Sequence, residues 1–127
     1  MTTSAALRDR YRTDAVETMS PARLVVALYD RLVLDLERAL AAIAQADFGA
    51  IHASLVHAQE IVTELHDALD VAVWPAGAQL VELYRYVHGE LVAANVGKDA
   101  ARVSGCRDIV TPLRDAWREA AGIVGRP

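Results

Sequence analysis

Apolar residues recur with a helical period along almost the whole chain from Ser20 onward. Turn-forming residues interrupt this period at three places, which are 47–49, 74–77 and 95–99. The three breaks leave four helical segments, which we predict at about 20–46, 48–70, 77–96 and 99–121. Because short connections favour antiparallel neighbours, the pattern predicts an all-α fold, an antiparallel up-down four-helix bundle.

The predicted bundle is a single domain of residues 20–122, with an N-terminal leader of residues 1–19 and a C-terminal tail of residues 123–127. A chain of 127 residues is long enough to bury a core without a metal or a disulfide. The leader contains four apolar residues, which are Tyr11, Ala15, Val16 and Met19. It is too short to form a stable helix alone, so we expect any order in it to come from docking on the bundle.

Several residues indicate where the helices begin and end. Ser20 is a good N-cap for the first helix, and Pro21 suits the first helical position, where its missing N–H is not needed. Gly97 suits the left-handed position that follows a helix end, and Asp99 can cap the last helix. Pro112 lies inside the last helix, where we expect it to cause a kink.

Each of the last three helices has one apolar stripe with a spacing of three and four residues, which predicts the side that faces the core. The stripe of the second helix is Phe48, Ile51, Leu55, Ala58, Val62, Leu65 and Leu69. The stripe of the third is Leu80, Tyr84, Val87, Leu91 and Ala94. The stripe of the fourth is Val103, Cys106, Val110, Leu113, Trp117 and Ala120.

The first helix is more apolar than a bundle helix needs. Its apolar residues are Val25, Val26, Leu28, Tyr29, Leu32, Val33, Leu36, Leu40 and Ile43. They cover an arc of roughly 160°, whereas an ordinary core-facing stripe covers about 100°. One interpretation is that this helix is the most buried one and touches two neighbours and the leader. The other is that part of the face is a groove for another chain, and the two interpretations are compatible.

Composition excludes several classes of partner. The formal net charge is −4, and the 13 Lys and Arg residues form no basic stripe, so a nucleic acid is not the expected ligand. No apolar run approaches the roughly 20 residues of a membrane span, so we expect no membrane insertion. The single cysteine, Cys106, and a polar start without the apolar region of a signal peptide predict a protein of the reducing cytoplasm.

The residues do not form a catalytic or metal-binding motif. The four histidines have neither the His-x-x-x-His nor the Glu-x-x-His spacing of helical metal sites. His52, His57 and His66 fall off the apolar stripe of the second helix and are expected in solvent, whereas His88, next to Val87, is expected to be partly buried. Cys106 lies on a core stripe, where a thiol is usually an inert small hydrophobe. We therefore predict no metal, no cofactor and no enzymatic activity.

The segment YRTDAVETMSPARLVVALYDRLVLDLERALAAI resembles the opening of the FliS family of flagellar secretion chaperones. The residues that carry the resemblance are Tyr11, Ala15, Thr18, Ser20, Pro21, Leu28, Tyr29 and Asp30. Three later segments, LVHAQEIVTELHDALD, LYRYVHGELVAANVGKD and TPLRDAW, are similar to family segments in the same order. The chain departs from the family at Arg31, where a glycine is common. It also departs at VAVWPAGAQ, where an acidic, Gly-rich link is usual and where we expect Trp74 to pack over the bundle end.

The resemblance implies a cytoplasmic chaperone that holds the disordered C-terminal segment of flagellin and prevents premature polymerisation. It also implies delivery to the export gate of the flagellar type III secretion apparatus, and other flagellar regulatory proteins as further partners. The implied client-binding residues are Tyr11, Ala15, Val16, Val25, Leu28, Tyr29, Leu32, Val33 and Leu36. Additional client contacts are expected from Leu91, Asn95 and Trp117. The alternative is a self-associating helical bundle, in which the wide apolar face forms a symmetric homodimer without a client.

Overall fold

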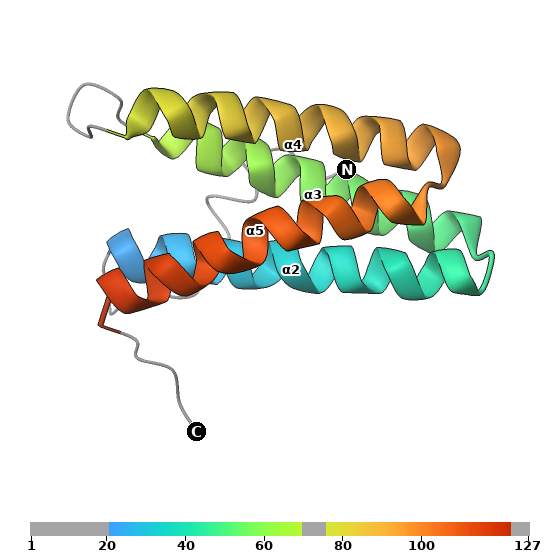
Figure 1. The fold of residues 1–127 in the computed structure, drawn as a ribbon. Coiled ribbons are helices and arrows are strands. Elements are labelled where there is room, and N and C mark those ends of the chain that lie inside the picture. The colour runs from blue at the N-terminus through green and yellow to red at the C-terminus, as the bar shows by residue number, and fades with distance from the viewer. Residues whose placement is uncertain (1–20, 70–75, 123–127) are drawn as a thin grey trace.

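The computed structural model describes residues 21–69 and 76–122, which form four α-helices and no strand. The helices are α2 (Pro21–Ala44), α3 (Phe48–Ala68), α4 (Gly77–Gly97) and α5 (Ala100–Ala120). They alternate in direction along the chain (Figure 1), so the predicted all-α, up-down four-helix bundle is confirmed. None of these four helices is both long and apolar enough to cross a membrane. The leader, Ser20, Trp74 and the tail lie outside the described residues.

The four helices surround one core, but their contacts are unequal. α2 packs against α3 and α5, and α4 packs against the same two helices, so α2 and α4 are diagonal partners. The contact between α4 and α5 is the least extensive of the four. These two helices meet at their short connection and diverge toward the other end of the bundle, where the end of α5 lies beside the start of α2 (Figure 1). The seam between α4 and α5 is therefore open at that end.

Aspartate side chains cap two of the helices. The Asp47 carboxylate accepts a hydrogen bond from the Ala50 amide at the start of α3, with an N–O distance of 3.1 Å. The Asp99 carboxylate accepts from the amides of Ala101 and Arg102 at the start of α5. Each cap satisfies amides that have no partner inside the helix. The predicted cap at Asp99 is confirmed.

The end of α4 differs by one residue from the prediction for Gly97. Gly97 is the last residue of the helix, and Lys98 takes the left-handed conformation, with φ of 52°. The Asp99 amide donates to the Ala94 carbonyl over 3.0 Å, which closes the helix end behind Lys98. The Lys98 ammonium donates to the Asn95 side-chain oxygen over 2.9 Å. α4 therefore ends at Gly97, one residue later than the end predicted from the position of this glycine.

Most of the predicted stripes face the core. The fully buried members on α3, α4 and α5 include Ile51, Leu55, Ala58, Val62, Leu65, Tyr84, Val87, Leu91, Ala94, Val103, Cys106 and Val110. The prediction that Phe48 faces the core is wrong, because Phe48 is the first residue of α3, at the end of the bundle, and its side chain is 63% exposed. α5 continues through Pro112 as one helix.

The wide apolar arc of α2 is used for packing within the bundle. Its buried residues are Val26, Leu28, Tyr29, Leu32, Val33, Asp35, Leu36, Ala39 and Ala42. The contacts of α2 with α3 and with α5 are the two most extensive helix–helix contacts in the bundle, which accounts for this broad buried face. The described part of the chain therefore favours the interpretation of this helix as the most buried one.

A buried hydrogen-bond chain crosses the core between helices that are not neighbours. The hydroxyl oxygens of Tyr29 on α2 and Tyr84 on α4 are 2.6 Å apart. The Trp117 side chain on α5 also lies close to the Tyr29 hydroxyl, where it acts to lower the pKa of that phenol. Burial raises the pKa of Tyr29 well above its usual range and also raises the pKa of Tyr84, so both phenols stay neutral. One tyrosine thus links three of the four helices.

We expect removal of either tyrosine hydroxyl to destabilise the bundle. Tyr84→Phe leaves the Tyr29 hydroxyl without one buried partner, and the free energy of unfolding should fall by about 1 to 2 kcal/mol. In the double variant Tyr29→Phe, Tyr84→Phe both partners are absent, so its loss should be smaller than the sum of the single losses. Urea unfolding followed by circular dichroism measures all three variants, and strictly additive losses would contradict a direct bond.

Candidate functional site: a groove between α4 and α5

An apolar groove of about 490 Å³ opens where α4 and α5 diverge. One wall is the start of α4, and the other is the second half of α5, so the groove lies at the open end of the bundle (Figure 1). Its lining consists of Ala76, Gln79, Leu80, Leu83, Leu113, Ala116, Trp117 and Ala120. We call this feature the α4–α5 groove.

The groove forms because two core stripes continue beyond the point where the helices separate. On α5, Val103, Cys106 and Val110 are buried, but Leu113 and Trp117 are only half-buried and Ala120 is exposed. On α4, Tyr84 is buried, whereas Leu80, one turn closer to the open end, is half-buried. The side chains that would close a core here lack cover from the opposite helix. Apolar side chains therefore remain partly accessible along this seam.

Polar contacts hold the end of α5 on α2 and away from α4. Arg118 donates to the Asp30 carboxylate over 2.8 Å, and the Arg114 side-chain nitrogen lies 3.8 Å from the same carboxylate. Next to them, Trp117 lies close to Tyr29. Tyr29 and Asp30 belong to the Leu-Tyr-Asp segment noted in the sequence, so this segment fixes the second half of α5 and with it one wall of the groove.

The chemistry of the α4–α5 groove is that of binding. Its described lining residues carry no ionisable side chain, so no pair of groups is present there for acid–base catalysis. Leucine side chains and the Trp117 indole offer apolar contact area, and the Gln79 amide can orient a polypeptide backbone by hydrogen bonding. A groove between two helices with this lining suits the apolar side chains of a helix or an extended segment.

The structure places the predicted client-binding residues in different environments. Tyr11, Ala15 and Val16 lie outside the described residues. The side chains of Leu28, Tyr29, Leu32, Val33, Leu36 and Leu91 are buried in the core, and Val25 packs against it. The buried residues could contact a client only if helices moved, and their client-binding role stays a prediction. Trp117 lines the α4–α5 groove.

Asn95, the remaining predicted contact, lies at the opposite end of α4 from the groove. Its side-chain NH₂ group donates to His52 Nδ1 over 2.9 Å, and its oxygen accepts from Lys98. These bonds connect α4 to the start of α3 and to the αL residue after α4. Asn95 therefore has a structural role in the closed bundle, and its contact with a client stays a prediction.

Several groove residues were missed by the sequence prediction, which placed the interaction face on the first helix. Leu83 and Ala116 were not singled out, although both line the groove. A usable signal was present on α5, where Leu113, Ala116, Trp117 and Ala120 follow the i, i+3, i+4, i+7 pattern of a widened apolar face. That pattern cannot by itself show that α4, the helix opposite, diverges from α5 along this stretch.

A second polar cluster joins α2 to α3. The His57 Nδ1 atom lies 2.5 Å from the Asp35 carboxylate, which is only 2% exposed, and Arg31 lies 3.2 Å from its other oxygen. Burial raises the pKa of the Asp35 carboxyl, and the nearby His57 and Arg31 oppose that rise. The prediction of a solvated His57 is wrong, because Asp35 points at α3 and draws the imidazole inward. This cluster is apart from the groove and is a structural contact.

The other candidate chemical groups have structural environments too. Cys106 is buried, and burial raises the pKa of its thiol to about 11, which keeps it protonated and unreactive at neutral pH. Its Sγ atom lies 4.0 Å from the Val87 carbonyl oxygen. Across residues 21–69 and 76–122, there is no cluster of three or more His, Cys, Asp and Glu side chains suited to a metal ion.

The fold and the groove define a class of protein, an all-α bundle with an apolar groove between two of its helices. The chain matches the family described as "Flagellar protein FliS" over residues 3–124. It is 30% identical over 110 residues to the protein named "Flagellar secretion chaperone FliS" of Bacillus subtilis (strain 168), an alignment that covers 87% of this chain and 82% of that relative. The chain belongs to the FliS family, as the sequence resemblance predicted.

Proposed function

We propose that this chain is a flagellar export chaperone that binds the disordered C-terminal segment of flagellin in the cytoplasm. Binding prevents premature polymerisation and allows delivery to the export gate of the flagellar type III secretion apparatus. The observation that carries the proposal is the α4–α5 groove, an apolar site whose described lining has no ionisable group, on a member of the FliS family. The name of the Bacillus subtilis relative, a flagellar secretion chaperone, supports the same role.

The groove can supply the binding free energy that such a client needs. A segment that folds on binding loses conformational entropy, which costs about 2 to 5 kcal/mol of the gross interaction energy. Each large apolar side chain that becomes fully buried contributes about 1.5 to 3 kcal/mol. Two or three client side chains seated against Leu80, Leu83 and Trp117 would offset that cost. A longer segment gains more by extending along the bundle surface.

The core residues of α2 enter this proposal in a different way from the groove. Val25 packs against the core from a half-buried position, while Leu28 and Val33 are buried. We propose that such residues contact the client only after local opening of α2, whereas the groove is accessible in the closed bundle. The competing hypothesis is a homodimer in which a second copy occupies the groove. We also propose that other flagellar regulatory proteins bind this chain as further partners.

A charge in the groove should weaken client binding without unfolding the bundle. Leu83→Asp places a carboxylate in the half-buried lining, where an apolar client side chain would have to desolvate it. We expect affinity for a flagellin C-terminal peptide to fall at least about tenfold, which is roughly 1.4 kcal/mol. Isothermal titration calorimetry measures the affinity, and circular dichroism checks that the variant is folded.

Val92→Asp is the matched control for this test. Val92 is on the same helix and exposed, and nine residues at about 100° each place it on the side opposite Leu83. The control should bind like the unmodified chain. If a folded Leu83→Asp variant binds the peptide as tightly as the unmodified chain, the groove is not part of the client-binding site. Light scattering without the peptide addresses the homodimer, because a dimer that Leu83→Asp dissociates would favour the competing hypothesis.

The leader should also take part in client binding. Tyr11, Ala15 and Val16 are apolar residues of the family-like opening, and we expect them to pack against the bound client. Deletion of residues 1–19, and the double substitution Tyr11→Ala, Val16→Ala, should therefore both weaken binding of the flagellin C-terminal peptide. Calorimetry of the two variants is the measurement, and affinities within about threefold of the unmodified chain, or roughly 0.7 kcal/mol, would exclude the leader from the client site.

A further inference from the structure

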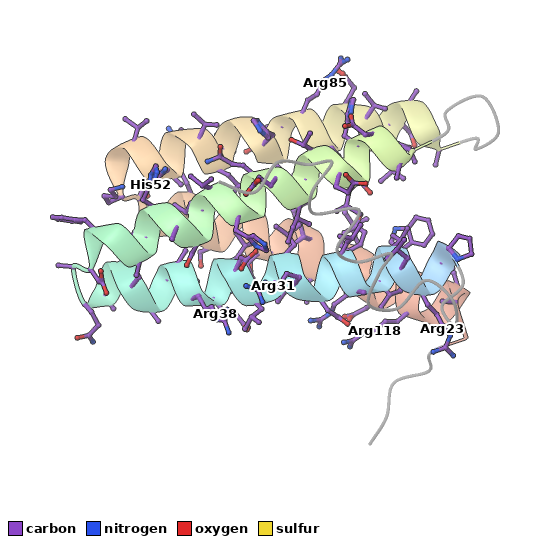
Figure 2. All side chains as sticks on the ribbon, turned by 180° about the vertical axis from the view of Figure 1, so that it is seen from behind. Arg23, Arg31, Arg38, His52, Arg85 and Arg118 are labelled. Carbon is purple, nitrogen blue, oxygen red and sulfur yellow. The ribbon has the colours of Figure 1, made fainter. Side chains whose placement is uncertain are left out.

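One carboxylate of α2 contacts two arginines of α5 beside the α4–α5 groove. Asp30 Oδ1 accepts a hydrogen bond from Arg118 over 2.8 Å, and the Arg114 side-chain nitrogen lies 3.8 Å from the same oxygen. The side chains of Asp30 and Arg118 are 43% and 36% exposed, so water and salt screen this contact. In Figure 2 Arg118 lies beside α2, on the opposite side of the bundle from Arg85 of α4. We call Asp30, Arg114 and Arg118 the Asp30 clamp.

The clamp and one wall of the groove belong to the same two turns of α5. Leu113 and Trp117 line the groove, and each is followed directly in the sequence by a clamp arginine. Successive residues of a helix point about 100° apart, which lets the arginines reach α2 while the apolar residues face the groove. Because hydrogen bonds hold a helical turn together, a shift of Arg118 relative to Asp30 also shifts Trp117 relative to α4.

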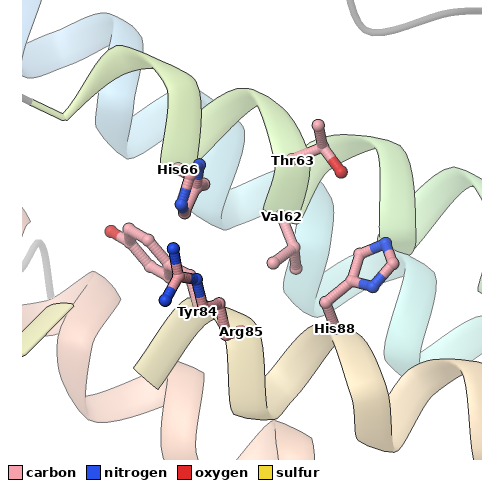
Figure 3. A pocket seen from close by; sticks show the side chains of 6 residues that line it. All are labelled: Val62, Thr63, His66, Tyr84, Arg85 and His88. Atoms are coloured by element: carbon pink, nitrogen blue, oxygen red, sulfur yellow. The ribbon is translucent and has the colours of Figure 1, made fainter. Parts of the chain in front are cut away.

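The other wall of the groove, α4, packs on α3. Tyr84 of α4 and Val62 of α3 are buried beneath a pocket of about 300 Å³ between these two helices (Figure 3). The contact of α4 with α3 is more extensive than its contact with α5. The two walls of the groove are thus held by different neighbours, α4 by α3 and the second half of α5 by α2.

Burial of apolar surface favours a narrower groove than the one observed. The large apolar side chains of the two walls are half-buried, and each would lose further contact with water if α5 moved toward α4. α2 and α4 are diagonal partners, so a movement of α5 toward α4 is a movement away from α2. That movement would lengthen the contact between Asp30 and Arg118. The clamp and the apolar walls therefore act in opposite directions on the same helix.

We propose that the Asp30 clamp holds the α4–α5 groove open and thereby sets the affinity for the client, although its three residues do not line the groove. The identity of the client rests on the proposed function. Asp30 is a positioning residue, because it acts through the placement of α5. A client binds only the open groove, so its apparent affinity falls with the open fraction. Because salt screens an exposed ion pair, client affinity should depend on ionic strength even though the described lining has no ionisable side chain.

The distance between the two groove walls tests the clamp without a client. Nitroxide labels on cysteines introduced at Glu82 of α4 and Glu119 of α5, both exposed, report it by double electron–electron resonance in the full-length chain. The chain with only the buried Cys106 is the labelling control. We expect shorter distances in Asp30→Asn and no change in Glu37→Gln, an exposed carboxylate on the same helix. An unchanged distance in a folded Asp30→Asn variant would overturn the proposal.

Client affinity is the second measurement. In calorimetry with the flagellin C-terminal peptide, Asp30→Asn and Arg118→Gln should each bind about threefold more weakly than the unmodified chain. The double variant should bind no more weakly than Asp30→Asn, because both substitutions break the same contact. A rise in sodium chloride from about 50 mM to about 500 mM should weaken the unmodified chain more than Asp30→Asn.

The two measurements separate the clamp from the proposed function. A shorter wall distance with unchanged affinity, losses that add in the double variant, or an equal effect of salt on both chains would overturn the positioning role of Asp30. If circular dichroism shows that Asp30→Asn is unfolded, Arg118→Gln alone decides both measurements. If the peptide does not bind the unmodified chain, the proposed function fails, and the wall distance still decides whether the clamp holds the groove open.

Discussion

The buried hydroxyl of Tyr29 is the contact on which the geometry of this bundle depends. It joins α2 to its diagonal partner α4 through a hydrogen bond with Tyr84, and it lies close to Trp117 of α5. A buried phenol must keep its partners, because an unsatisfied hydroxyl in a core is unfavourable. The adjacent Asp30 holds Arg118 on the outside of the same helix pair. These contacts all lie where the second half of α5 packs beside α2, which is the end of the bundle where α5 and the start of α4 diverge.

The open seam follows from that constraint, and the proposed function follows from the seam. A bundle whose four helices packed equally would bury Leu80, Leu113 and Trp117 and would leave no room for another chain. Here these residues are half-buried and line the α4–α5 groove.

The sequence predicted the architecture well, because the helical spacing of apolar residues and the turn-forming residues between helices are local properties of the chain. The up-down bundle, the cap at Asp99 and the family are confirmed. Errors arose where a residue's environment depends on a distant segment. Phe48 follows its stripe but lies beyond the cover of other helices, and His57 is drawn inward by Asp35 of another helix. Neither effect is visible in a single helical pattern.

The location of the site was the least predictable feature, for the same reason. The wide apolar face of α2 correctly indicated an unusual helix. The spacing of apolar residues cannot show, however, whether that face binds another chain or packs against neighbouring helices of the bundle. The stripe of α5 looks like core along its whole length, although only its first half is buried. The difference is the divergence of α4 and α5, which depends on tertiary contacts such as the Tyr29 hydrogen bond and the Asp30 ion pair.

Hydrogen–deuterium exchange of the full chain, with and without a flagellin C-terminal segment, tests the central claim most directly. If the client binds in the α4–α5 groove, exchange should slow at the amides of residues 77–84 and 113–120, because a bound segment covers these turns and suppresses their local opening. Exchange in the middle of α3, away from the groove, should change little. Slower exchange confined to α2 and α3, with residues 77–84 and 113–120 unchanged, would contradict the claim.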